Sequence, residues 1–256
     1  MSGTQIKVLD KAIQILELLA AARKGVRLKD VVGSLGLNKS TALRILRVLE
    51  SHDVVSRNGN ATFVLGNRVL WWETCYRRNF DLLEVVRPYL EKVRDLTEET
   101  VIFSILVGSR SVIVNQAISP HVTSSRYGLG AAAPLHAGAS GKAILAFLST
   151  EKRRQFLRQS DLERLTGRTV TDKKGLERQL AEIRAGGVAI TRGERFLNTA
   201  SVAAPVFNSR GEGVGAIAVI GPSERLTSVR LREIAVLLVK EARLLTEQLS
   251  KTGEIV

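Results

Sequence analysis

The amino-acid sequence predicts an α+β protein with a small, mostly helical N-terminal unit and a larger mixed C-terminal unit. Three observations carry this prediction. Apolar residues recur at helical spacing in the first fifty positions, and an Asn-Gly pair then separates two β-branched runs. Further along the chain, β-rich runs joined by short turns alternate with helical patterns. A length of 256 residues also favours two domains over one.

The chain opens with two predicted helices. The first has apolar residues three or four positions apart, at Ile6, Leu9, Ile13, Leu16 and Leu19. We expect it to end in the basic segment AARKG, with Gly25 just beyond the last turn. The second is shorter, is closed by Gly36, and has its apolar side at Leu28, Val31, Val32 and Leu35.

A third helix is predicted to begin after Asn38, a favoured N-cap residue, and to run to Glu50. Its inner face comprises Ala42, Leu43, Ile45, Leu46 and Leu49. Its outer face holds Lys39, Ser40, Thr41, Arg44 and Arg47, with no carboxylate before Glu50. Such a face suits a DNA major groove, where Arg binds guanine in a bidentate fashion. Ordinary solvated charges on an amphipathic helix remain an alternative.

Two helices joined by a tight Gly turn, the second with a basic outer face, form a helix-turn-helix. After it, Val54–Arg57 and Ala61–Leu65 are predicted to pair as a hairpin around a two-residue type I′ turn at Asn58-Gly59. A hairpin in this place is a wing, and Arg57 at its tip suits a DNA backbone contact. The hairpin could also simply complete a small core, and both roles are compatible.

Charge and composition favour a polyanionic partner. The chain has 38 Lys and Arg against 25 Asp and Glu, a net charge of +13, and the excess is densest in residues 1–80. The apolar runs are too short for a transmembrane helix, and Asp10 and Glu17 interrupt the N-terminal apolar pattern, which argues against a signal peptide. A single cysteine, Cys75, excludes an internal disulfide. We therefore expect a cytoplasmic protein with no membrane partner.

The segment from Leu65 to Phe80 is predicted to be a helical connector that carries Trp71, Trp72 and Tyr76. These aromatic residues favour burial at a helix–helix contact, although stacking on single-stranded nucleic acid would also use them.

The C-terminal unit is predicted to be α+β. Helices are expected at 82–97, 139–148, 151–158 and 173–185, with a long one at the end of the chain. Strands are expected as a hairpin around Gly108-Ser109-Arg110 and at 188–191, 201–207 and 214–220, while 124–138 is expected to be a loop.

The chain resembles the IclR family of bacterial transcriptional regulators. The resemblance lies in LKDVVGSLGLNKSTALRILRVLESHDVV with FVLG, in PLHAGASGKAILA (Pro134 to Ala146), and in SVAAPVFNSRGEGVGAIAVIGP (Ser201 to Pro222). Asn38 departs from the Pro of many members, but both residues suit a helix start. The resemblance implies a winged helix-turn-helix at 1–66, a linker helix at 67–80 and a GAF-like effector-binding domain at 81–256. It also implies that the linker helix and the N-terminal domain help to form a dimer.

The resemblance also implies an effector pocket. Its lining positions would be Val122, Ser125, Leu129, Gly130, Ala139, Ser140, Thr191, Thr199, Ser201, Ala218 and Ile220. Where members that bind small organic acids often carry hydroxyls or a carboxylate, this chain has Ala218 and Ile220. We therefore expect a rather apolar pocket for an aromatic or otherwise hydrophobic acid, whose polar end meets Ser140, Thr191 or Ser201.

Signals for chemistry are weak. The segment GASGKA lacks the Gly and the Ser or Thr that a phosphate loop requires. The helix start near Ala139 could accept a small anion, although taken alone its small residues favour tight packing of the loop instead. The three histidines have no partner at metal-ligand spacing, and Ser140 with His136 lacks a nucleophile elbow. We predict no catalytic site, no metal and no cofactor.

Together these observations predict a sequence-specific DNA-binding regulator of the IclR type, a homodimer or a dimer of dimers on a pseudo-palindromic operator, with affinity controlled by a small organic effector. Two rival classes remain. A non-specific nucleic-acid binder would need no pocket. An enzyme with an appended helix-turn-helix would need catalytic residues that the sequence does not display.

Overall fold

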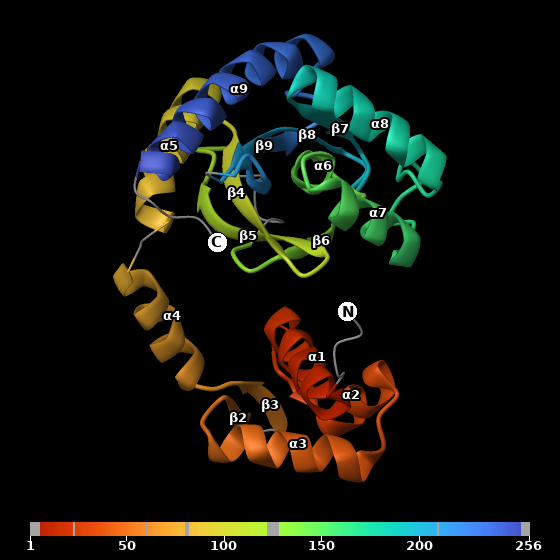
Figure 1. The fold of residues 1–256 in the computed structure, drawn as a ribbon. Coiled ribbons are helices and arrows are strands. Elements are labelled where there is room, and N and C mark those ends of the chain that lie inside the picture. Colours follow the sequence, from red (N-terminus) through yellow and green to blue (C-terminus); the bar gives the residue numbers. More distant parts are fainter. Residues whose placement is uncertain are drawn as a thin grey trace. The chain divides into compact units, whose positions relative to one another are not determined.

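The structure is a computed structural model that describes residues 6–22, 24–59, 61–79, 82–121, 128–208 and 210–251, apart from the side chains of Asn79 and Val214. The chain divides into two compact units, residues 1–81 and 82–256 (Figure 1). The predicted α+β class is confirmed, because the first unit combines helices with a three-stranded sheet and the second combines helices with a six-stranded sheet.

The N-terminal unit is a winged helix-turn-helix. Its elements are α1 (Lys7–Ala21), β1 (Val26–Arg27), α2 (Leu28–Leu35), α3 (Lys39–Ser51), β2 (Val55–Asn58), β3 (Thr62–Leu65) and α4 (Arg68–Asn79). Gly36 ends α2 in the left-handed region at φ 59°, a conformation that glycine adopts at little cost, and so the chain turns directly toward α3. Ile15, Val31 and Leu46 meet in one apolar core, which confirms the helix-turn-helix prediction.

The apolar stripe expected for α1 was only partly right. Leu19 is buried as expected, but the other fully buried residue of α1 is Ile15, which the prediction did not include. Leu9 and Ile13 are more than half exposed. The helix also ends at Ala21, before the basic residues, because the chain turns at Gly25 (φ 79°) to enter β1. This short strand was not predicted and pairs with β3.

The hairpin is present, but the predicted two-residue turn was wrong. β2 and β3 pair antiparallel with Asn58 opposite Thr62, which leaves a three-residue loop rather than a type I′ turn. Ala61, at φ 55°, supplies the left-handed residue that such loops need, and its N–H donates to the Asn58 carbonyl at 3.0 Å. Asn60, within this loop, lies outside the described residues.

The C-terminal unit is built on one antiparallel sheet with strand order β6-β5-β4-β9-β8-β7. The strands are β4 (Thr100–Val107), β5 (Arg110–Ala117), β6 (Ala132–Pro134), β7 (Ala189–Arg192), β8 (Thr199–Phe207) and β9 (Gly213–Pro222). β4 and β5 form the predicted hairpin, with Val107 opposite Arg110. The strands near 188, 201 and 214 are confirmed, whereas β6 lies in the stretch that was expected to be only a loop.

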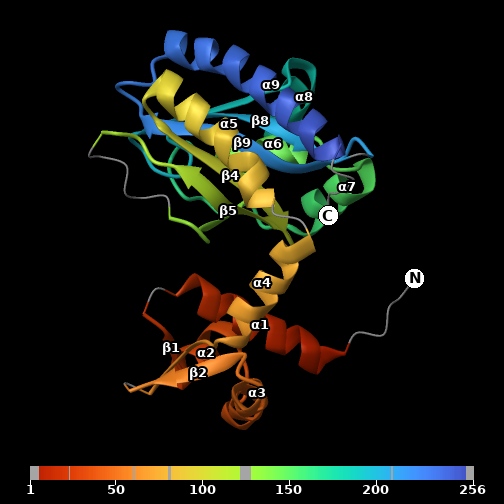
Figure 2. The same ribbon diagram turned by 90° about the vertical axis from the view of Figure 1, so that its left-hand side faces the viewer.

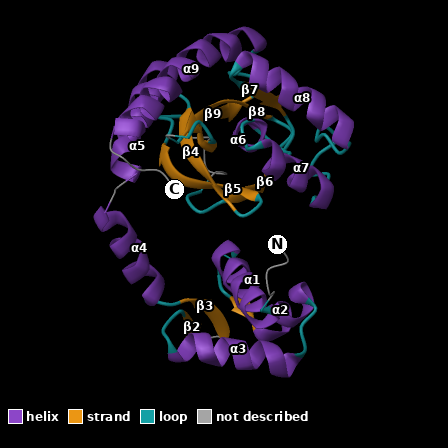
Figure 3. Ribbon diagram, in the orientation of Figure 1, coloured by secondary structure: helices purple, strands orange, loops and turns teal. Residues whose placement is uncertain are grey.

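Helices cover both faces of this sheet. They are α5 (Leu82–Thr97), α6 (Ala139–Ala146), α7 (Thr150–Gln159), α8 (Lys173–Gly186) and α9 (Ser228–Lys251), close to the predicted bounds. α5 and α9 pack together on one face, while α6 lies within the curve of the other face, with α8 beyond it (Figures 2 and 3). Because α6 begins beside β7, β8 and β9, its first residues and the inner face of the sheet enclose the space described below.

Candidate functional site

The outer face of α3 is exposed and basic. Lys39, Ser40, Arg44 and Arg47 are all exposed, whereas Ala42, Ile45 and Leu46 on the opposite side are buried. In the described part of the chain, Arg44 and Arg47 make no ion pair. Their guanidinium groups are therefore available to an external partner, as a base-reading pair requires.

Two details of α3 differ from expectation. Asn38 occupies the N-cap position with extended backbone, as predicted, but its side chain makes no capping hydrogen bond. Only the Asn38 carbonyl takes part, accepting the Ala42 N–H at 3.0 Å. Thr41 is half-buried, so it presents less of its surface than Ser40 does. The first-turn N–H groups of α3 thus remain free of a side-chain cap, which suits a phosphate contact.

Arg57 of the wing is exposed but has partners. Its Nε lies 3.4 Å from Glu50 Oε1 at the end of α3, and its guanidinium lies 4.9 Å from the ring centroid of Phe63. Both side chains of the ion pair are substantially exposed, so the pair contributes little free energy and exchanges readily for a phosphate. The Arg57 side chain is therefore held against Glu50 and Phe63 rather than extended away from the protein.

Large apolar residues are exposed on α1 and α4. On α4, Trp71 is 59% exposed and Trp72 and Tyr76 are nearly as open, so the expected burial does not occur within the described chain. On α1, the exposed set is Ile6, Val8, Leu9 and Ile13. Exposed apolar groups gathered in this way are typical of protein–protein contacts. Cys75, also on α4, is half-buried and unpaired.

A narrow pocket lies between the inner face of the second unit's sheet and the start of α6. The room inside it for a water-sized sphere is about 30 Å³, so an organic ligand must widen the pocket to enter it. Its apolar walls include Ile102, Ile113 and Ile220, and six of the predicted positions line it: Ala139, Ser140, Thr191, Thr199, Ser201 and Ile220. A wider hollow shares Arg195, Thr199 and Ile220 with it, so the two spaces adjoin.

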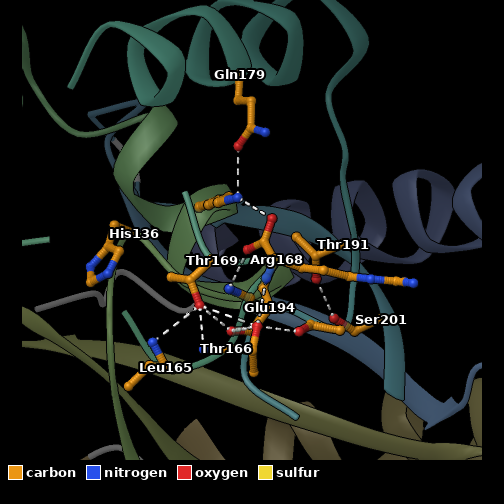
Figure 4. A network of polar contacts seen from close by, with 12 residues as sticks. His136, Leu165, Thr166, Arg168, Thr169, Gln179, Thr191, Glu194 and Ser201 are labelled. Carbon is orange, nitrogen blue, oxygen red and sulfur yellow. Dashed lines mark hydrogen bonds and ion pairs between the residues drawn. The ribbon is translucent and has the colours of Figure 1, made fainter. Parts of the chain in front are cut away.

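Two hydroxyls in this pocket are bonded to each other. Thr191 on β7 is directly opposite Ser201 on β8, and their hydroxyl oxygens lie 2.9 Å apart (Figure 4). Each hydroxyl keeps further hydrogen-bonding capacity, since a hydroxyl both donates and accepts. The pair can therefore receive the polar end of a small molecule without leaving either oxygen unpartnered.

A buried ion pair closes one wall of the pocket. Lys142 of α6 is only 1% exposed and pairs with the carboxylate of Glu194, while its Nζ also donates to Gln179 Oε1 at 2.7 Å (Figure 4). Burial lowers the pKa of Lys142, and Glu194 opposes that shift. The Glu194 carbonyl is in turn fixed by Thr169, whose hydroxyl donates to it at 2.7 Å.

Glu194 also occupies part of the anion position expected at the start of α6. The N–H of Gly138, the N-cap of α6, donates to Glu194 Oε2 at 2.9 Å. A carboxylate of the protein itself thus uses one of the N–H groups at this helix start. An external anion would meet the following residues, Ala139 and Ser140, which face the pocket.

The remaining predicted positions do not line the narrow pocket. Leu129 is 61% exposed, and Gly130, shortly before β6, is also exposed. Ala218 is fully buried in the core and has no surface in the cavity. Val122 and Ser125 lie outside the described residues.

Several pocket residues were missed by the sequence reasoning. They are Ser104, Ser111, Glu194 and Arg195 in the lining and Lys142 behind it. The sequence did mark Ser104, because it is the one polar residue within the apolar run VIFSILV. It also marked Lys142, as the one charge in the otherwise small and apolar ASGKAILA. It did not mark Arg195, because that residue follows a turn with no periodicity.

Among the described residues, no group of three or more potential ligands is arranged to hold a metal ion. His136, labelled in Figure 4, is buried. Its Nε2 lies 2.9 Å from the Glu163 carbonyl, as expected for a structural histidine. Within the same ranges, no helix is both long and apolar enough to cross a bilayer.

Comparison with known proteins gives consistent results over both units. A family model for the IclR helix-turn-helix domain matches residues 8–59, and a model described as the C-terminal domain of the bacterial transcriptional regulator IclR matches residues 74–247. The HTH-type transcriptional regulator BhcR of Paracoccus denitrificans is 31% identical over 93% of this chain and 85% of its own length.

Solved structures agree in fold. An IclR-type transcriptional regulator from Silicibacter sp. TM1040 aligns with a TM-score of 0.86 at 27% identity, over 94% of this chain and 96% of that one. An IclR homologue from Microbacterium hydrocarbonoxydans, solved with 4-hydroxybenzoate, aligns with a TM-score of 0.72 at 23% identity, over 94% of this chain and 99% of that one.

Proposed function

The chain belongs to the IclR family of bacterial transcriptional regulators, and we propose that α3 reads its operator while the pocket beside α6 binds a small organic acid. The observation that carries the first part is the exposed, carboxylate-free face of α3. A regulator of this kind works in the cytoplasm, where the DNA is.

In DNA recognition, α3 enters the major groove. Arg44 and Arg47 lie three residues apart on the outer face, near enough along the helix to reach neighbouring base pairs. Ser40 and Thr41, in the first turn, contact base edges or phosphates. Lys39 at the helix start and Arg57 of the wing contact the DNA backbone, with Arg57 exchanging Glu50 for a phosphate.

Two copies of the chain bind one operator. The exposed apolar residues of α1 and α4, among them Ile13, Trp71 and Trp72, supply surfaces that a second copy would cover. A two-fold dimer places two recognition helices about one DNA turn apart, or a multiple of it, and so requires a pseudo-palindromic operator. A dimer of dimers would bind two such operators.

The effector is a small, fairly apolar acid. Three isoleucine and three alanine side chains form the apolar part of the pocket walls, and an equal number of serine and threonine residues also line it, among them the Thr191–Ser201 pair and Ser140 at the start of α6. Arg195, at the junction with the wider hollow, adds a positive charge that favours a carboxylate. The fold neighbour solved with 4-hydroxybenzoate supports an aromatic acid as one candidate.

The regulatory step is a coupling between the two sites. Effector binding changes the separation of the two recognition helices in the dimer and therefore the operator affinity, with a coupling of about 1–3 kcal/mol. Selection of bound sequences from a random DNA library, followed by titration with aromatic and aliphatic acids, tests the proposal. A preferred pseudo-palindrome whose affinity responds to one class of acid supports it, whereas uniform binding to all sequences contradicts it.

A further inference from the structure

Ser104, on the central strand β4, has a buried hydroxyl without a hydrogen-bond partner. The residue is 1% exposed, and its Oγ contacts no donor or acceptor in the described part of the protein. Buried polar groups are nearly always hydrogen-bonded, because an unpartnered hydroxyl loses its water without replacement. Ser104 lines the narrow pocket, so the missing partner can come from a molecule that occupies it.

The strand geometry explains why this hydroxyl faces the pocket. Ile102 and Ser104 are two residues apart on β4 and therefore point to the same face of the sheet, and both line the pocket. The pairing of β4 with β5 shifts by one residue at this point, but the extra residue is on β5, and the pairing of β4 with β9 continues unbroken past Ser104. The alternation of β4 is therefore regular and places Ser104 on the inner face.

Several other polar groups of the pocket have protein partners, whereas the hydroxyls of Ser111 and Ser140 have none within the described ranges but are less completely buried than that of Ser104. Thr191 and Ser201 are bonded to each other, and Glu194 is held by Lys142 and by the Gly138 N–H. Among the described residues, Ser104 Oγ is the one unpartnered buried side-chain atom that lines this pocket. A fully buried hydroxyl without a partner in the lining of a pocket points to a contact made by the ligand.

The sheet register places Ser104 away from the polar end of the pocket. On β9, Ile220 lies opposite Ser201, whereas Ala216, four residues earlier, lies opposite Ser104. Four residues of strand span about 13 Å. Ile102 lies opposite Ala218, midway between Ala216 and Ile220 along β9. The pocket therefore has polar groups at two separated places and an apolar stretch between them.

We propose that Ser104 is an effector-binding residue that forms a hydrogen bond with a hydroxyl or carbonyl group on the part of the effector remote from its carboxylate. This rests on the proposed function, in which the carboxylate lies near Ser140 and the Thr191–Ser201 pair. The effector class is then narrower than an apolar acid. It is an acid whose apolar body carries a second hydrogen-bonding group, such as a hydroxy acid.

Calorimetry with matched acids tests this inference on the full-length protein. The probes are benzoate with 4-hydroxybenzoate and hexanoate with 6-hydroxyhexanoate, each pair differing by one hydroxyl. The unaltered protein should bind the hydroxylated member of at least one pair more tightly, by about 2- to 10-fold, as one neutral hydrogen bond provides. Ser104→Ala should abolish that preference while retaining affinity for the parent acid.

Ser223→Ala is the matched control. It also removes a buried, unpartnered serine hydroxyl, but one outside the pocket, so its binding should equal that of the unaltered protein. If the unaltered protein binds acids without favouring a hydroxyl, or if Ser104→Ala keeps the preference, the inference fails and the proposed function stands. Loss of both members of a pair assigns Ser104 a structural role and overturns the inference. If the unaltered protein binds none of the acids, the acid-effector proposal itself fails, and the inference with it.

Discussion

Arg57 and Glu50 form an ion pair that joins the wing to the end of α3, with Arg57 Nε 3.4 Å from Glu50 Oε1. Glu50 is the first carboxylate on α3, and it holds the wing arginine that a DNA backbone contact would need. The pair is exposed and so contributes less than about 1 kcal/mol to stability. Its larger effect is on DNA binding, since Arg57 must leave Glu50 to contact a phosphate.

Glu50→Gln should therefore strengthen DNA binding by a few-fold at low salt. The change removes a negative charge near the DNA and frees Arg57, which increases the number of phosphate contacts and steepens the salt dependence. Fluorescence anisotropy over a salt series measures both effects. Glu73→Gln, the same charge change on α4, removes the ion pair with Arg77 instead and serves as the control. Equal affinity gains for the two variants would mean that net charge alone is responsible.

Lys142→Met should destabilise the C-terminal unit by about 3–5 kcal/mol, because Glu194 would keep a buried charge without its partner. The double variant Lys142→Met with Glu194→Gln should recover part of that loss. Denaturant unfolding of the single and double variants measures the coupling. Additive losses would show that the ion pair does not act as a unit.

The same lysine gives a pH dependence of defined sign. Burial lowers the Lys142 pKa in the folded protein below its ordinary value of 10.5, so the unfolded chain binds more protons between the two values. Between these two pKa values, the free energy of unfolding should therefore increase as the pH rises. Lys142→Met should lack this increase in unfolding curves recorded over the same pH range. An identical alkaline profile for both proteins would contradict the assignment.

Ser104→Ala should raise the stability of the protein without effector, by about 0.5–2 kcal/mol, because it removes an unpartnered buried hydroxyl. Ser119→Ala is the contrasting variant. Its hydroxyl donates to the Glu98 carbonyl at 2.6 Å, so its loss should destabilise the fold. Thermal unfolding in effector-free buffer compares the two. If Ser104→Ala instead destabilised the protein, the Ser104 hydroxyl would already have a hydrogen-bond partner in the absence of effector.

Ile13→Glu and Trp71→Glu should each shift the protein toward monomer and weaken operator binding at least 10-fold, since both introduce a charge into an exposed apolar surface of the N-terminal unit. Light scattering across a concentration series measures the mass. Val236→Glu on α9 changes an even more exposed apolar residue and should leave the mass unchanged. A stable dimer in all three variants would rule these surfaces out as the interface.

Local patterns predicted much of the fold. The 3.6-residue period of α3 separated Arg44 and Arg47 from the buried Ile45 and Leu46, because one helix face determines both sets. The helical period also predicted the long terminal helix, and the two β-rich runs around Gly108-Ser109-Arg110 predicted the β4–β5 hairpin. The wing turn did not, because Ala61, rather than the Asn-Gly pair, adopts the left-handed conformation that closes the loop.

The candidate pocket was harder to predict because its polar groups come from distant segments. Lys142 and Glu194 are 52 residues apart, and their pairing depends on the packing of α6 against the turn after β7. On α1, period alone could not decide between Ile13 and Ile15, since the helix carries apolar residues around much of its circumference. Which face of such a helix is buried depends on its tertiary contacts, and these cannot be read from a single sequence.

The most direct test of the account is the binding of Arg44→Ala and Arg47→Ala to the selected operator and to random DNA of equal length. Each variant should lose about 1–3 kcal/mol on the operator, with relaxed preference at one base position and little loss on random DNA. Arg184→Ala, on α8 of the other unit, should bind both DNAs like the unaltered protein. Unchanged operator affinity in both α3 variants would contradict the claim that this helix face reads DNA.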